Sequence, residues 1–114
     1  MTARDTRIEW HGVPRSEEAE AFIRQQAARL AAAYSGVWVR RVTLESTDPR
    51  GSLMGPVCAS VEVRGPERQI LVNREQDEAV AALRQAFDVV FGAFERRHTG
   101  GRRTSDAERY VLAA

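Results

Sequence analysis

The sequence predicts one α+β domain, a two-layer sandwich in which a four-stranded sheet carries two helices on one face. The predicted elements follow in the order strand, helix, three strands, helix, or β-α-β-β-β-α. Apolar and polar side chains alternate along the strands, which is typical of a sheet with one solvated face and one covered face. The 114 residues are enough for one core and too few for two. We expect the domain to span residues 1–98, with a flexible tail containing arginine and glycine over 99–114.

The first strand is predicted over residues 7–13, where apolar and polar residues alternate until a Gly-Val-Pro break. Ser16 is suited to cap a helix over residues 17–34, because its hydroxyl oxygen can accept a hydrogen bond from the first turn. Gly36 follows the helix and can adopt the left-handed conformation of a C-terminal cap. The apolar residues of this helix recur three or four positions apart: Ala19, Ile23, Ala27, Leu30 and Tyr34.

Three further strands are predicted over residues 37–46, 57–64 and 68–74. Their links are short, so neighbouring strands should be antiparallel. The strand over 57–64 alternates most regularly, with its valines and Ala59 on one face. Arg40-Arg41 interrupts the alternation of the preceding strand, where we expect a β-bulge.

The second helix is predicted from Asp77 to Arg97. Asp77 is a candidate N-cap, and the basic residues that end the helix suit the negative end of its dipole. Beyond the helix, one helical turn is expected near residues 108–112. The apolar residues of the helix again define a buried face: Ala79, Leu83, Ala86, Phe87, Val90 and Phe94.

The second helix is apolar around more of its circumference than a two-layer fold requires, because Val89 and Phe91 lie outside the buried stripe. One interpretation is that Phe91 folds back over the edge of the sheet. The other, which we favour, is that Val89 and Phe91 form a protein-interaction surface, since exposed apolar patches mark interaction sites. A homodimer through this helix is the partner that this interpretation predicts.

Composition and motif spacing argue against several classes of protein. The net charge is only +1, so any anion-binding surface must come from local clustering of the 17 arginines, which are the only basic residues besides two histidines. The chain has one cysteine, lacks an apolar signal segment and has no window long enough to span a membrane, so we expect a cytoplasmic protein. His11 and His98 lie at opposite ends of the chain, and we expect no catalytic site, metal or cofactor.

Arginine placement is the feature that stands out. If the two helices lie side by side, their outer surface would present a basic strip to an RNA backbone. Two structural alternatives remain: Arg84 is four residues before Asp88 and could pair with it, and Arg96 and Arg97 suit any helix C-terminus. The predicted RNA-binding residues are Arg24, Arg29, Arg84, Arg96, Arg97, Arg102 and Arg103.

Several short stretches between about residues 7 and 98 also match a known family in order and spacing. They are Ser16-Glu17, Arg29-Leu30 and Tyr34 in the first helix, Arg41-Val42-Thr43-Leu44, a loop with Asp48, Arg50 and Gly51, Cys58 in a strand ending Glu62-Val63-Arg64-Gly65, and Glu78, Val80, Leu83, Asp88, Val90 and Phe94 in the second helix. In these stretches the chain resembles the ribosome hibernation-promoting factor family, also known as ribosome-associated inhibitor A or sigma-54 modulation proteins, in a divergent short form.

The resemblance implies a fold related to double-stranded-RNA-binding domains and a binding site on the RNA of the small ribosomal subunit. It implies a stress factor that blocks translation by occupying the channel for messenger and transfer RNA, without catalysis. The chain departs from the family where the second helix normally carries basic residues, because it has Val89, Phe91 and Gly92 there. The alternative hypothesis is therefore a protein-interaction module or homodimeric adaptor that does not bind the ribosome.

Overall fold

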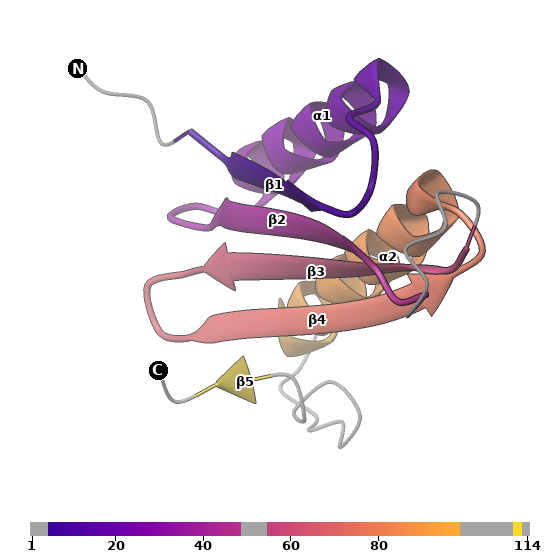
Figure 1. The fold of residues 1–114 in the computed structure, drawn as a ribbon. Coiled ribbons are helices and arrows are strands. Elements are labelled where there is room, and N and C mark those ends of the chain that lie inside the picture. Colours follow the sequence, from indigo (N-terminus) through magenta and orange to yellow (C-terminus); the bar gives the residue numbers. More distant parts are fainter. Residues whose placement is uncertain (1–4, 49–54, 99–110, 113–114) are drawn as a thin grey trace.

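The computed structural model describes residues 5–48, 55–98 and 111–112, and it has the predicted order of elements (Figure 1). The elements are β1 (Arg7–His11), α1 (Glu17–Ala33), β2 (Trp38–Ser46), β3 (Val57–Arg64), β4 (Gln69–Gln76), α2 (Ala79–His98) and β5 (Val111–Leu112). The spatial order of the sheet is β1-β2-β3-β4-β5, in which β1 is parallel to β2 and the other pairs are antiparallel. The predicted four-stranded sheet is present, and the short β5 extends it at one edge.

Both helices cover the same face of the sheet, which confirms the predicted two-layer sandwich (Figure 1). Helix α2 lies over β3 and β4, and α1 lies over β2 beside α2. The helices run in the same direction, because Phe22 near the start of α1 meets Phe87, whereas Tyr34 at its end meets Phe94. Both helices therefore begin at the end of the sheet where β2 finishes, and both end where β2 starts.

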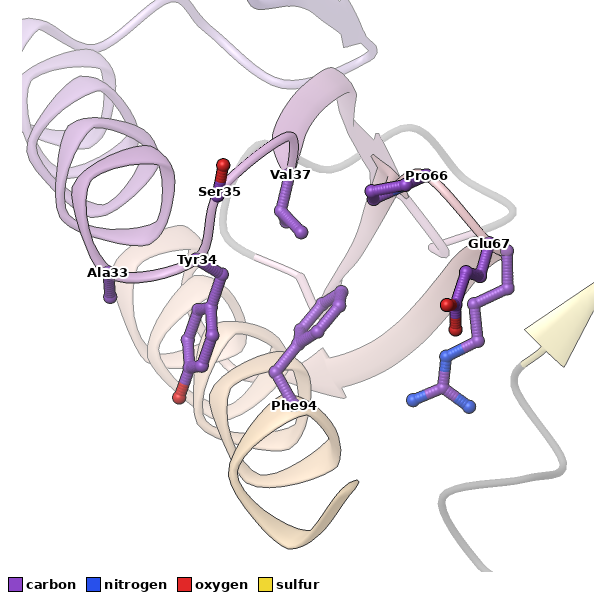
Figure 2. Close-up of a pocket in the computed structure, with 9 residues that line it drawn as sticks. Ala33, Tyr34, Ser35, Val37, Pro66, Glu67 and Phe94 are labelled. Carbon is purple, nitrogen blue, oxygen red and sulfur yellow. The ribbon is translucent and has the colours of Figure 1, made fainter. Parts of the chain in front are cut away.

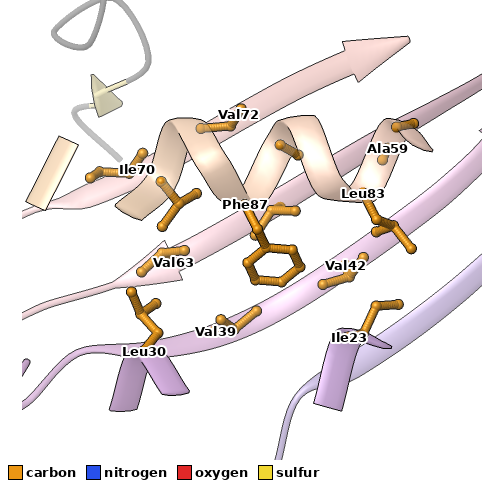
Figure 3. Packing of buried hydrophobic residues seen from close by; sticks show 14 of the residues in the cluster. Ile23, Leu30, Val39, Val42, Ala59, Val63, Ile70, Val72, Leu83 and Phe87 are labelled. Atoms are coloured by element: carbon orange, nitrogen blue, oxygen red, sulfur yellow. The ribbon is translucent and has the colours of Figure 1, made fainter. Parts of the chain in front are cut away.

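The hydrophobic core lies between the helices and the sheet. Figure 3 shows the ring of Phe87 pointing from α2 into the middle of this core, with Val39, Val42 and Val63 around it. The strand β3 contributes every second residue to the core, as its alternation predicts. The largest fully buried side chains are Phe87, Ile23, Leu30, Leu44, Ile70, Leu83, Val39, Val42, Val61, Val63, Val72 and Val90.

Local chemistry sets the ends of α1 as expected. The backbone N–H of Ala19 donates to Ser16 Oγ at 3.1 Å, which confirms Ser16 as the N-cap. Tyr34 caps the other end through its backbone N–H, which donates to Leu30 O. Gly36 follows with a φ of +79°, and a Cβ there would lie 2.9 Å from Pro66 Cγ. Only glycine meets both requirements without strain at this turn.

The predicted start of α2 was wrong by two residues. The helix begins at Ala79, and its first main-chain hydrogen bond runs from the Ala82 N–H to Glu78 O, so Glu78 rather than Asp77 occupies the N-cap position. The reason is that β4 is longer than predicted. It continues to Gln76, which pairs with Val57 at the start of β3.

Two other local predictions have clear outcomes. The expected bulge is confirmed, since the register between β2 and β3 shifts between Val39 and Arg41. The helical turn expected near residues 108–112 is wrong at Val111 and Leu112, which instead pair with Ile70 and Gln69 of β4. Strand pairing supplies hydrogen bonds to the open edge of β4 that an isolated helical turn would not. The rest of that turn lies outside the described residues, as does most of the predicted tail.

Replacing Phe87 with alanine should reduce the free energy of unfolding by about 3–5 kcal/mol, because the substitution leaves a cavity at the centre of the core. Urea denaturation followed by circular dichroism would measure this change. A loss below about 1 kcal/mol would contradict the central position of this ring.

Candidate nucleic-acid interface

The contact between α1 and α2 is made by aromatic rings with two guanidinium groups above them, and we call this contact region the helix seam. It consists of Phe22, Arg29 and Tyr34 from α1 and its cap, and Arg84, Phe87, Phe91 and Phe94 from α2. At its start Phe22 meets Phe87 edge to face, with ring centroids 6.2 Å apart. At its other end Tyr34 meets Phe94 with centroids 5.3 Å apart. Such pairs stabilise the contact between the helices beyond their buried area.

Arg29 and Arg84 are exposed, and each lies over an aromatic ring of the opposite helix. Arg29 Cζ is 5.2 Å from the centroid of the Phe91 ring, and Arg84 Cζ is 5.7 Å from that of Phe22. Both distances are within the range of cation–π attraction. Arg29 Nη1 also donates to Oε1 of the buried Gln26 at 3.2 Å. These contacts limit the motion of two cations at the surface of the helical layer.

The alternative in which Arg84 pairs with Asp88 is not observed, because no ion pair joins these two residues of the described chain. The side chain of Arg84 lies over Phe22 instead. The attraction between exposed charges four residues apart on a helix is small, so contact with an aromatic ring can outweigh it.

Arg24 is exposed on α1, but it differs from Arg29 and Arg84 in having a carboxylate partner. Its Nη2 lies 3.3 Å from Glu20 Oε2, and Arg15 Nη2 lies 3.4 Å from the other oxygen of the same carboxylate. The carboxylate of Glu20 is thus shared by two exposed arginines, in a turn that also carries Glu17 and Glu18. An exposed pair of this kind is weak and can rearrange when a stronger anion approaches.

Of the remaining predicted RNA-binding residues, two have a known position only along the backbone, and two lie outside the described residues. Arg96 and Arg97 belong to the last turn of α2, at the end of the seam marked by Phe94. Arg102 and Arg103 lie outside the described residues.

Val89 and Phe91, predicted to form a protein-interaction surface, are half-buried and pack against the core. Part of Phe91 is covered by Arg29. Only part of each side chain is therefore exposed to a partner, and the homodimer through α2 stays a prediction.

A hollow of about 440 Å³ lies at the end of the seam (Figure 2). Tyr34 and Val37 converge on it from the link between α1 and β2, Phe94 reaches it from α2, and the β3–β4 turn closes it on the other side. Arg68 lines this hollow, with its Cζ 5.8 Å from the centroid of the Phe94 ring. The end of the seam is therefore an apolar recess with an arginine at its edge.

Sequence analysis missed a second group of arginines, on the open face of the sheet. The register places Arg7 of β1 opposite Arg41 of β2, and Arg64 of β3 opposite Trp38. These residues lie at the end of the sheet where the helices finish. The bulge at Arg40-Arg41 was a visible signal, but its consequence for the position of the side chains depends on pairing with β3.

The opposite end of the molecule is acidic. The first turn of α1 carries three glutamates, and on the sheet Glu45 and Glu75 flank Cys58 on the two neighbouring strands. Burial raises the pKa of the Cys58 thiol, and these glutamates add to the rise although a hydrogen bond with Ser60 opposes it. The thiol is thus kept neutral, which disfavours a role as nucleophile or metal ligand.

The described residues contain no cluster of three or more histidine, cysteine or acidic side chains that could hold a metal ion. No helix in the same part of the chain is long and apolar enough to cross a membrane.

Comparison with solved structures finds the same fold in two proteins of low sequence identity. The N-terminal domain of Protein Y from Thermus thermophilus has a TM-score of 0.65 at 18% identity, covering 79% of this chain and 93% of that domain. A ribosomal subunit interface protein from Coxiella burnetii has a TM-score of 0.62 at 10% identity, covering 82% and 96%. No protein-family model and no curated protein matches the sequence. At these identities the similarity establishes the fold, and supports the resemblance to hibernation factors at that level.

The contact between Arg29 and Phe91 should be measurable as an energetic coupling. In a double-mutant cycle of Arg29→Gln and Phe91→Leu, we expect a coupling of about 0.5–1 kcal/mol in the free energy of unfolding. Urea denaturation of the four proteins measures it. The same cycle with Arg24→Gln in place of Arg29→Gln is the control, because Arg24 pairs with Glu20. Equal coupling in both cycles would contradict the assigned contact.

Proposed function

We propose that this chain binds the RNA of the small ribosomal subunit through the helix seam and blocks translation by occlusion. The observation that carries the proposal is the placement of Arg29 and Arg84 at the exposed surface of the seam, each over a ring of the neighbouring helix. The fold shared with Protein Y and with a ribosomal subunit interface protein supports the same assignment.

Phosphate recognition needs cations that are both available and held in place. A guanidinium group binds phosphate oxygens through paired N–H groups, and an arginine already restrained loses less entropy on binding. Arg29 is restrained by Phe91 and Gln26, whereas Arg84 is restrained by Phe22. With a net charge of +1, the chain has no general attraction for nucleic acid, so this local arrangement supplies the affinity.

The proposed strip follows the direction of the two helices. Arg24, Arg29 and Arg84 lie on the helical layer, and the last turn of α2 extends it through Arg96 and Arg97. Because both helices end on the same side, the negative ends of their dipoles also meet there, and the arginines offset that charge for an approaching phosphate. Binding of this kind excludes other ligands from the RNA without making or breaking a covalent bond.

Replacing Arg29 and Arg84 together with glutamine should weaken binding to purified small ribosomal subunits. Each lost phosphate contact should also reduce the slope of log affinity against log salt concentration by about 0.7–0.9. Co-sedimentation at several salt concentrations measures both quantities, and translation in a purified system should be inhibited by the wild-type chain and less by the double variant.

The matched control is Arg15→Gln, since Arg15 is an exposed arginine at the acidic end of the molecule. It should bind like the wild type. Absence of ribosome binding by the wild-type chain, together with a dimer that Phe91→Asp disrupts, would overturn the proposal in favour of an adaptor that works through α2.

A further inference from the structure

The β-bulge places two consecutive arginines on the open face of the sheet, the face opposite the helices. Val39 and Val42 on either side of them are buried in the core, but Arg40 and Arg41 both reach Glu62 on β3. Arg40 Nη1 is 3.0 Å from Glu62 Oε2, and Arg41 Nε is 3.6 Å from Glu62 Oε1. In a regular strand consecutive side chains point to opposite faces, so one of these arginines would point toward the core.

These two arginines line a hollow of about 250 Å³ together with Asp5, Arg7 and Trp38. The parallel pairing of β1 with β2 brings Arg7 into it, directly opposite Arg41. Three guanidinium groups thus face three carboxylates, because Asp5 lines the hollow, Glu62 pairs with Arg40 and Arg41, and Glu9 Oε2 lies 3.9 Å from Arg7 Nε. Arg64, which is exposed and lies opposite Trp38 on the neighbouring strand, leaves one positive charge in excess. The arginines also lie beside the indole ring of Trp38.

The arginines of this hollow are partly fixed before any ligand arrives. The side chains of Arg40 and Arg41 are 41% and 38% exposed, and that of the shared Glu62 is 21% exposed. Arg41 Nε is buried and has no hydrogen-bond partner within the described chain, because Glu62 Oε1 lies too far away. One carboxylate therefore positions both guanidinium groups while part of each side chain stays exposed, and an anion that reaches the exposed N–H groups would gain charge-assisted hydrogen bonds.

We propose that this hollow binds one nucleotide, with its phosphate against Arg7, Arg40 and Arg41 and its base against Trp38. Arginine forks suit phosphate oxygens, and aromatic side chains stack on bases of any sequence. A nucleotide presents both a phosphate for the arginines and a base for the indole. The nucleotide can belong to a single RNA strand or be free in solution, since both present a phosphate beside a base.

The site does not depend on the helix seam or on ribosome binding, because it lies on the other face of the sheet. If both surfaces bind RNA, the domain would contact two separate RNA segments, one on each layer. The two contacts can be separated experimentally, since their arginines come from different elements.

The fluorescence of Trp38 reports on this hollow in a Trp10→Phe background, which leaves Trp38 as the only tryptophan. We expect a saturable change with single-stranded oligoadenylate and with adenosine monophosphate, and little change with inorganic phosphate. Tighter binding of the oligonucleotide would assign the site to RNA, and equal binding of the mononucleotide would assign it to free nucleotides. Arg40→Gln with Arg41→Gln should raise the dissociation constant about tenfold or more.

Three further variants make the result decisive. Arg7→Gln should weaken binding without affecting folding, because the Arg7 side chain is 71% exposed. Arg15→Gln and the double change Arg29→Gln with Arg84→Gln should leave the Trp38 response intact, whatever their effect on ribosome binding. The proposal is overturned by an unchanged Trp38 signal with both nucleotide probes, by an equal response to phosphate alone, or by a response that survives the Arg7, Arg40 and Arg41 changes.

Discussion

The whole structure depends on burying one face of a sheet under two helices. The sheet offers a row of valines and an alanine from β3, and α2 covers it with Phe87 at the centre. Helix α1 then has to pack beside α2, and the parallel pairing of β1 with β2 makes it run in the same direction. This arrangement brings Phe22, Tyr34 and Phe94 into the contact between the helices, and so creates the seam.

Covering the sheet with two helices that run in the same direction also separates charge along the molecule. Both helices begin at one end, where three glutamates in the first turn of α1 favour the positive end of its dipole, and both finish at the end where β2 starts. Arginines of the sheet gather at this second end, so a chain of net charge +1 presents a distinctly basic region. An RNA would be steered toward that region by the local field rather than by the total charge.

Periodicity and capping were sufficient to predict the fold, because each element carries its own local signal. Ser16 marks the start of α1, and the alternation of β3 identifies the buried face of the sheet. Contacts between elements were harder to predict. The register of β2 against β3 decides where Arg40 and Arg41 point, and helix packing decides that Arg84 meets Phe22 instead of Asp88. The sequence showed that α2 has more apolar residues than its buried face requires. It did not show that one of them, Phe91, packs against Arg29.

Electron cryo-microscopy of small ribosomal subunits saturated with this chain tests the central claim most directly. The account predicts density for the domain in the channel for messenger and transfer RNA, with α1 and α2 facing the RNA and Arg29 and Arg84 at its phosphates. A bound domain whose helices face solvent, or subunits without added density at saturating protein, would contradict it.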